Sequence, residues 1–112
     1  MSDERPVYLR LRDLIAAAIL DGTYGDGDLL PSVRSLAAEH GANPLTVAKA
    51  YQSFQEDGLV TVRRGVGMFV APGAAQRLRN AERDMFLRER WPEIRATMRR
   101  LGIEPAELLE RA

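Results

Sequence analysis

The sequence predicts a mainly α-helical fold with one small β-hairpin. Three observations lead to this prediction. Apolar residues recur at helical spacing through residues 6–57, two short β-branched runs follow within residues 58–71, and helical spacing returns after Pro72. The Pro72-Gly73 pair marks a boundary, so we expect one domain in residues 1–71 and a shorter helical region in residues 72–112.

The composition is that of an ordinary globular protein. The chain has 112 residues, of which 46% are hydrophobic and 29% are charged. No apolar run approaches the roughly 20 residues that a membrane-spanning helix needs. The first residues are acidic where a secretion signal would be basic, and the chain has no cysteine. We therefore expect a cytoplasmic protein.

Charge is balanced over the whole chain, with 16 basic and 16 acidic residues. Residues 1–72 hold 7 basic and 9 acidic side chains, and residues 73–112 hold 9 and 7. A surface that binds nucleic acid would therefore have to be a local patch. Its candidate cations are Arg34, Lys49, Arg63 and Arg64.

Residues 6–21 are predicted to form the first helix. Its apolar residues recur at spacings of three and four, which places them on one face. They are Val7, Leu11, Leu14, Ile15, Ala18 and Ile19. Gly22 suits the end of this helix.

Residues 22–30 alternate aspartate and glycine, as some calcium-binding loops do. A calcium loop of the EF-hand type ends in a bidentate glutamate, but Ala37 stands at the twelfth position counted from Asp26. A turn rich in glycine and aspartate is the better interpretation, and we expect no metal site and no cofactor.

Residues 31–41 are predicted to form the second helix. Ser32 can cap its N-terminus, and Arg34 points outward close to that end. His40 lies in the last turn, where a histidine more often interacts with the helix dipole than with a metal. Only about three residues separate this helix from the next, which is the spacing of a helix-turn-helix.

Residues 42–57 are predicted to form the third helix. Asn43 can cap it, and Pro44 suits its first position. The spacing of Val47, Tyr51 and Phe54 predicts an inward face. The outer residues offer donors suited to a DNA major groove. They are Thr46, Lys49, Gln52 and Ser53, with Leu45 near the N-terminal end.

Residues 58–71 change to strand spacing. The runs 59–63 and 68–71 are joined by a glycine-containing loop, which predicts a hairpin with Arg63 and Arg64 near its tip. Arginines there could contact a phosphate backbone or a minor groove. Three helices followed by a basic hairpin make a winged helix-turn-helix.

Four stretches also resemble a known family. They read LPSVRSLA at residues 30–37, GANPLTVAKAY at residues 41–51, DGLV at residues 57–60 and RRGVGMFV at residues 63–70. Together they closely resemble the GntR family of bacterial transcription regulators over roughly residues 6–71. The pattern Asn43-Pro44-x-Thr46-Val47 is similar to its YtrA-like subgroup, which has short C-terminal regions.

The resemblance implies that Ser32, Arg34, Thr46, Lys49, Arg64 and Gly65 contact an operator. The full set of candidate DNA-binding residues adds Asn43, Leu45 and Arg63. Two positions depart from the family pattern. Ala48 replaces a residue that is basic in many relatives, so one contact is missing, and Asp26-Gly27-Asp28 replaces a common Pro-Gly-Asp.

Residues 72–112 are predicted to form helices that mediate dimerisation. Pro92 should kink or restart the helix, Gly102 should end it, and Glu104-Pro105 should open a last short helix. These segments carry more apolar surface than they can bury alone, so a second copy is the expected partner. The candidate dimerisation residues are Leu78, Met85, Trp91, Ile94, Met98, Leu101 and Leu108. The alternative is that these helices pack back on the first helix of the same chain.

The leading hypothesis is a sequence-specific DNA-binding regulator, expected to be a repressor that binds a near-palindromic operator as a homodimer. The resemblance suggests control of a transporter operon and of its own gene. The alternative is a winged helix that docks another protein without specific DNA binding. No catalytic triad or metal cluster is visible, so we expect no enzyme activity. A small-molecule effector could use a cleft near Phe86, Trp91 and Met98, although core packing is the simpler role for these residues.

Overall fold

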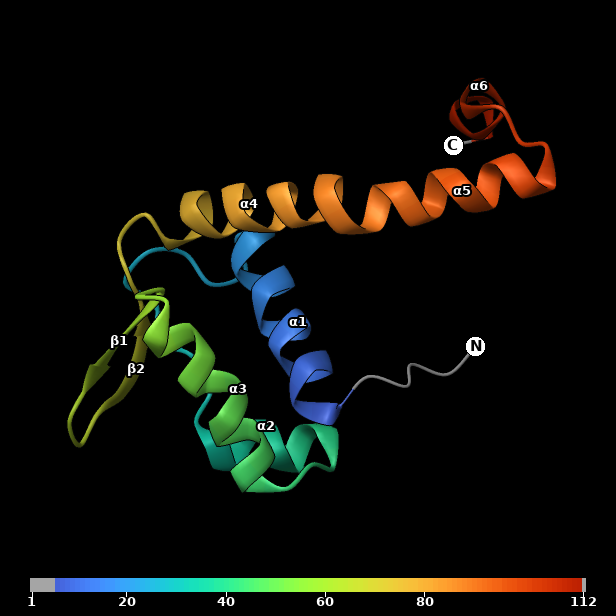
Figure 1. The fold of residues 1–112 in the computed structure, drawn as a ribbon. Helices are drawn as coiled ribbons and strands as arrows, with labels where there is room; N and C mark the ends of the chain where they lie inside the picture. Colours follow the sequence, from blue (N-terminus) through green and yellow to red (C-terminus); the bar gives the residue numbers. More distant parts are fainter. Residues whose placement is uncertain (1–5, 112) are drawn as a thin grey trace. The chain divides into compact units, whose positions relative to one another are not determined.

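The computed structural model describes residues 6–111 as a series of helices interrupted by one hairpin (Figure 1). In chain order the elements are α1 (Val7–Leu20), α2 (Val33–His40), α3 (Pro44–Glu56), β1 (Val60–Arg63), β2 (Gly67–Val70), α4 (Ala74–Met85), a π-helical turn (Phe86–Arg90), α5 (Trp91–Leu101) and α6 (Pro105–Glu110). The chain divides into two compact units between Arg79 and Asn80. The prediction of a mainly helical winged fold with a C-terminal helical region is confirmed.

The helix boundaries follow the capping residues expected from the sequence. The Ser32 hydroxyl accepts a hydrogen bond from the Ser35 backbone N–H at 3.0 Å and caps α2. The Asn43 side chain accepts one from the Leu45 N–H at 2.8 Å and caps α3. Pro44 takes the first position of α3, where its missing N–H would have no partner.

The core of the N-terminal unit lies where α1, α2 and α3 meet the hairpin. Val47, Tyr51 and Phe54 are at most 1% exposed, which confirms the predicted inward face of α3. The predicted apolar face of α1 is only partly buried, because Val7 and Leu14 are 44% and 52% exposed. Ala16 is buried in their place, so α1 is turned slightly relative to the expectation.

The hairpin pairs β1 with β2 in antiparallel register, with Val60 opposite Val70 and Arg63 opposite Gly67. The linker after α1 lies along β2: the Leu30 N–H donates to the Met68 carbonyl at 2.9 Å, and the Val70 N–H donates to the Asp28 carbonyl at 2.9 Å. The hairpin is therefore anchored at its base, while its loop remains exposed.

The first turns of α4 belong to the N-terminal unit. Ala74 and Leu78 are 0% and 1% exposed and pack within its core. The Arg77 guanidinium donates to the Gly58 carbonyl at 2.7 Å, and the Asp26 carboxylate accepts from the Gly73 N–H at 2.9 Å. The compact N-terminal unit thus extends past residue 71, where the sequence suggested a boundary.

The C-terminal helices are continuous across Pro92, where a kink or a restart was expected. Helical structure runs from Ala74 to Leu101, with the π-helical turn immediately before Trp91 and Pro92 in the first turn of α5. A wider π turn accommodates a local irregularity without ending the helix. Gly102 ends α5 with φ of 69°, as expected. No helix within residues 6–111 is both long and apolar enough to cross a bilayer.

Candidate nucleic-acid interface

The outward face of α3 is narrower than the sequence suggested. Leu45 is 79% exposed, and Ala48, Lys49 and Gln52 are also exposed. Their spacing of three, one and three residues makes them one face. Thr46, expected on this face, is half-buried.

Ser53 also departs from the expected outer face. It is half-buried, and its hydroxyl donates to the Ala50 carbonyl at 2.8 Å. The outward face from Leu45 to Gln52 is therefore one leucine, one alanine, one lysine and one glutamine, while Pro44, Gln55 and Glu56 are exposed at the ends of α3. An amide and an ammonium can reach base edges or phosphates, and a leucine can contact a thymine methyl.

Lys49 makes a contact that sequence reasoning missed. Its ammonium nitrogen lies 4.0 Å from the centroid of the Tyr8 ring on α1. This is the geometry of a cation–π interaction. Periodicity within α3 could not have revealed it, because the partner lies on another helix far away in the sequence.

The N-terminus of α2 offers a second group of donors. Arg34 is exposed and makes no ion pair with any residue in the described range 6–111. The Ser32 hydroxyl, besides capping α2, donates to the Ser35 hydroxyl at 2.9 Å. Both residues lie at a helix N-terminus, where backbone N–H groups and the helix dipole favour phosphate.

Tyr51 fixes the position of this N-terminus relative to α3. Its hydroxyl donates to the Pro31 carbonyl at 2.6 Å, directly before the α2 cap. Burial, together with the nearby Tyr24 hydroxyl, raises the pKa of Tyr51 to about 12. The hydroxyl therefore stays protonated as a donor up to a higher pH than an ordinary tyrosine does.

The hairpin supplies the third group of candidate DNA-binding residues. Arg63 lies over the Phe69 ring, 4.7 Å from its centroid, while Arg64 and Gly65 in the loop are exposed. A hollow of about 450 Å³ lies between the hairpin and the start of α2, and Ser32, Arg63, Arg64 and Gly65 all line it. The structure thus brings four of the predicted DNA-binding residues to one groove. Of the other five, Leu45 and Lys49 lie on the exposed face of α3, Arg34 lies on α2, Asn43 caps α3, and Thr46 is half-buried.

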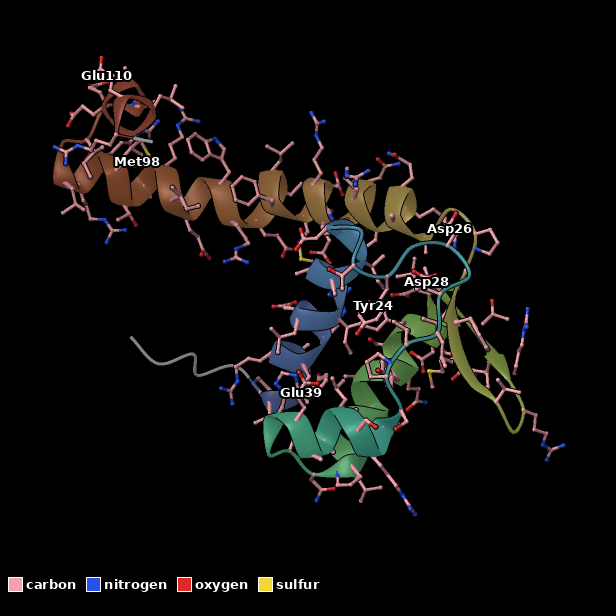
Figure 2. The ribbon with its side chains drawn as sticks, turned by 180° about the vertical axis from the view of Figure 1, so that it is seen from behind. Tyr24, Asp26, Asp28, Glu39, Met98 and Glu110 are labelled. Carbon is pink, nitrogen blue, oxygen red and sulfur yellow. The ribbon has the colours of Figure 1, made fainter. Side chains whose placement is uncertain are left out.

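The aspartates of the linker are held by backbone groups. Figure 2 shows Asp26 and Asp28 on this linker after α1. Asp26 accepts from the Gly73 N–H, and Asp28 accepts from the Gly25 N–H at 2.8 Å. Across the described part of the chain, no group of three or more histidine, cysteine or acidic residues could hold a metal ion.

The predicted dimerisation residues fall into three groups. Leu78 packs in the core of its own N-terminal unit, so it does not present a surface to a partner. Met98 is 6% exposed, and with the half-buried Trp91 it lines a hollow in the C-terminal unit. The remaining residues are exposed and apolar: Met85, Ile94, Leu101 and Leu108.

Comparison with known proteins agrees with this geometry. Residues 7–70 match the description "Bacterial regulatory proteins, gntR family". The chain belongs to this family. It is 31% identical over 105 residues to the HTH-type transcriptional repressor YtrA of Bacillus subtilis, covering 94% of this chain and 80% of YtrA. The likeness to YtrA supports the YtrA-like subgroup, and members of this GntR family are transcriptional regulators rather than enzymes.

Comparison with solved structures leads to the same family. A GntR family transcriptional regulator from Listeria monocytogenes matches with a TM-score of 0.77 and 28% identity, covering 98% of this chain and 95% of that one. AraR(DBD), solved in complex with operator ORX1, matches with a TM-score of 0.58 and 27% identity, covering 60% of this chain and 81% of that one. This GntR-family chain therefore shares the winged helix-turn-helix fold.

Proposed function

We propose that this GntR-family chain is a sequence-specific DNA-binding regulator that represses transcription by occupying an operator. The observation that carries the proposal is the grouping of the α3 face, the α2 N-terminus and the hairpin loop on one unit. Together they offer Lys49, Gln52, Arg34 and Arg64 as exposed donors. Phosphate contacts would position the protein, and contacts from α3 would read base edges. The operator complex of AraR(DBD), a structural neighbour, supports this use of the fold.

Residues 1–71 would bind the operator and residues 72–112 would mediate dimerisation. The exposed apolar side chains of the C-terminal unit support this division, because Leu87, Ile94 and Leu101 are 51%, 39% and 67% exposed. Ile94 and Leu101 lie seven residues apart on α5, which places them on one face. Such spacing is typical of a helix that packs against another helix. A two-fold dimer would present two copies of α3 and would favour a near-palindromic operator.

The regulated genes are proposed from the resemblance to the YtrA-like subgroup. They are a transporter operon and the gene of this protein itself. A regulator that binds chromosomal DNA would act in the cytoplasm. No cofactor is required for this mechanism, and any effector would act by changing the affinity for the operator.

The proposal is tested by a gel-shift titration of the full chain against its own upstream region. Sheared unrelated DNA serves as competitor, and the titration is run at two salt concentrations. We expect a shift that resists competitor, has two chains per operator and weakens as salt rises, because phosphate contacts release counterions. A genome-wide selection of bound fragments extends the test to other operators. If that selection also enriches no sequence, the alternative of a protein-docking module is favoured and the proposal fails.

A further inference from the structure

The C-terminal unit contains a hollow of about 460 Å³ beside α5. One wall is a face of α5, and the other is the turn that follows Gly102. Residues from both walls line it: Trp91, Arg95, Met98, Arg99, Gly102, Ile103, Glu104 and Pro105. The volume lies within the range of small-molecule sites, which is roughly 300 to 1,000 Å³.

The shape of the hollow follows from how α5 ends. Gly102 adopts a positive φ of 69°, and the Ile103 N–H donates to the Met98 carbonyl at 2.9 Å. The chain therefore turns back beside the last turns of α5. Figure 2 shows Met98 on the side of α5 that faces α6. Met98 is 6% exposed and forms the apolar floor.

Three larger side chains line the hollow beside Met98, and their positions on α5 follow the helical repeat. Trp91, Arg95 and Arg99 are four residues apart, so they share one face of α5. The indole is half-buried, and both arginines are exposed. The hollow thus combines a flat aromatic wall with two guanidinium groups one helical turn apart.

The two arginines have no acidic partner within the described residues. Neither forms a salt bridge in the described range 6–111. The nearest acid in the lining, Glu104, belongs to a capping box of α6: its carboxylate accepts the Glu107 N–H, and the Glu107 carboxylate accepts the Glu104 N–H at 3.2 Å. The lining thus holds two guanidinium groups and one carboxylate, with an excess of one positive charge, beside the apolar side chains of Trp91, Met98 and Ile103.

We propose that this hollow binds an aromatic carboxylate. The ring would stack on Trp91 above Met98, since indole faces favour offset stacking with another flat ring. The carboxylate would accept charge-assisted hydrogen bonds from Arg95 and Arg99, whose planar donors suit its geometry. The site uses residues of the C-terminal unit alone, and its test needs no DNA, so it stands independently of the proposed operator binding.

Trp91 supplies the measurement. It is the single tryptophan of the chain, so intrinsic fluorescence at indole wavelengths reports on this hollow. The full-length protein is titrated with benzoate as the probe and with benzamide, which has the same ring but no charge. We expect a saturable change with benzoate and at least tenfold weaker binding of benzamide. Equal responses to the two compounds, or no saturable response to benzoate, would overturn the proposal.

Matched variants separate charge recognition from a structural effect. Arg95→Gln and Arg99→Gln should each lower the affinity for benzoate by about tenfold, and Arg95→Lys should retain part of it. Arg100→Gln is the control, because Arg100 is exposed and does not line the hollow. Circular dichroism checks that each variant is folded. A control variant that loses as much affinity as the other two would contradict the assignment.

Varying the protein concentration tests whether a second copy of the chain, instead of a small ligand, occupies the hollow. If a second copy of the chain fills the hollow, the Trp91 emission would change on dilution through the dimer–monomer transition, and benzoate would bind only to the monomer. That result would overturn the proposal in favour of a dimer contact. Benzoate affinity that is independent of protein concentration is the expected result.

Discussion

The Lys49 ammonium lies 4.0 Å from the centroid of the Tyr8 ring and joins the exposed face of α3 to α1. A lysine on a solvated helix face ordinarily samples many rotamers. The aromatic ring restricts Lys49 to the α1 side of that face. We propose that this contact positions the cation for DNA, which would reduce the cost of ordering the Lys49 side chain on binding.

Replacing Tyr8 tests this positioning. Tyr8→Leu should weaken operator binding by several-fold, because the ring that orients Lys49 is lost, whereas Tyr8→Phe should bind as the parent does. Lys49→Ala should weaken binding by several-fold, and adding Tyr8→Leu to it should cost little more. A gel-shift titration of the three single variants and the double variant measures the coupling. Fully additive losses would show that the two residues act separately.

The arginines of α2 and of the hairpin loop are expected to contact phosphates. Arg34→Ala should weaken operator binding at least as much as Lys49→Ala, and Arg64→Ala should also weaken it. Each change should reduce the slope of log affinity against log salt by about 1. Arg79→Ala is the control, because Arg79 lies on α4 and donates to Gln76 at 3.3 Å. If Arg34→Ala and Lys49→Ala both bind like the parent, the assigned DNA-binding face is wrong.

The raised pKa of the Tyr51 hydroxyl predicts that the free energy of unfolding depends on pH. Its pKa is raised to about 12 in the folded chain, against about 10 in an unfolded chain. Between these values the unfolded chain loses the proton and the folded chain keeps it, so stability should fall by about 1.4 kcal/mol per pH unit. At neutral pH this contribution is fully present.

Tyr51→Phe isolates that contribution. At pH 7 the variant should be less stable by about 1 kcal/mol, because the 2.6 Å hydrogen bond to the Pro31 carbonyl is removed. From pH 10 to 12 the parent should lose about 2 kcal/mol that the variant does not lose, so the difference between them shrinks to zero and then reverses. Denaturant unfolding at several pH values measures both effects. Parallel pH curves would contradict the assigned pKa.

The exposed apolar side chains of α5 are predicted to hold the dimer together. The double change Ile94→Asp and Leu101→Asp places charges on positions that are 39% and 67% exposed. We expect a monomer by light scattering and at least about tenfold weaker operator binding, because one half-site contact is lost. Ala96→Asp changes an exposed residue on another side of α5 and should stay dimeric. A double variant that remains dimeric would place the interface elsewhere.

Local sequence signals predicted much of the fold. Ser32, Asn43 and Pro44 marked helix starts because capping depends on residues that are close in the chain. Val47, Tyr51 and Phe54 marked the inner face of α3 because a helix has a fixed period. The hairpin followed from β-branched residues around a glycine-containing loop.

Helical periodicity predicts which residues share a face, but it does not predict which neighbouring element covers that face. Thr46 was expected to be exposed and is half-buried, while Leu14 was expected to be buried and is 52% exposed. Both depend on how α1 lies against α3, which is a long-range relationship. The Tyr8–Lys49 contact and the core position of Leu78 are of the same kind, because each joins helices that are distant in the sequence.

The burial of Ala74 and Leu78 limits how this DNA-binding unit can be exchanged between proteins. A fragment cut after residue 71 would lose two core side chains and the Arg77 donor that binds the Gly58 carbonyl. It would expose the apolar surface that those side chains cover. A protein that carries this unit fused to a different C-terminal region should therefore keep the opening turns of α4, up to the boundary of the compact unit after Arg79.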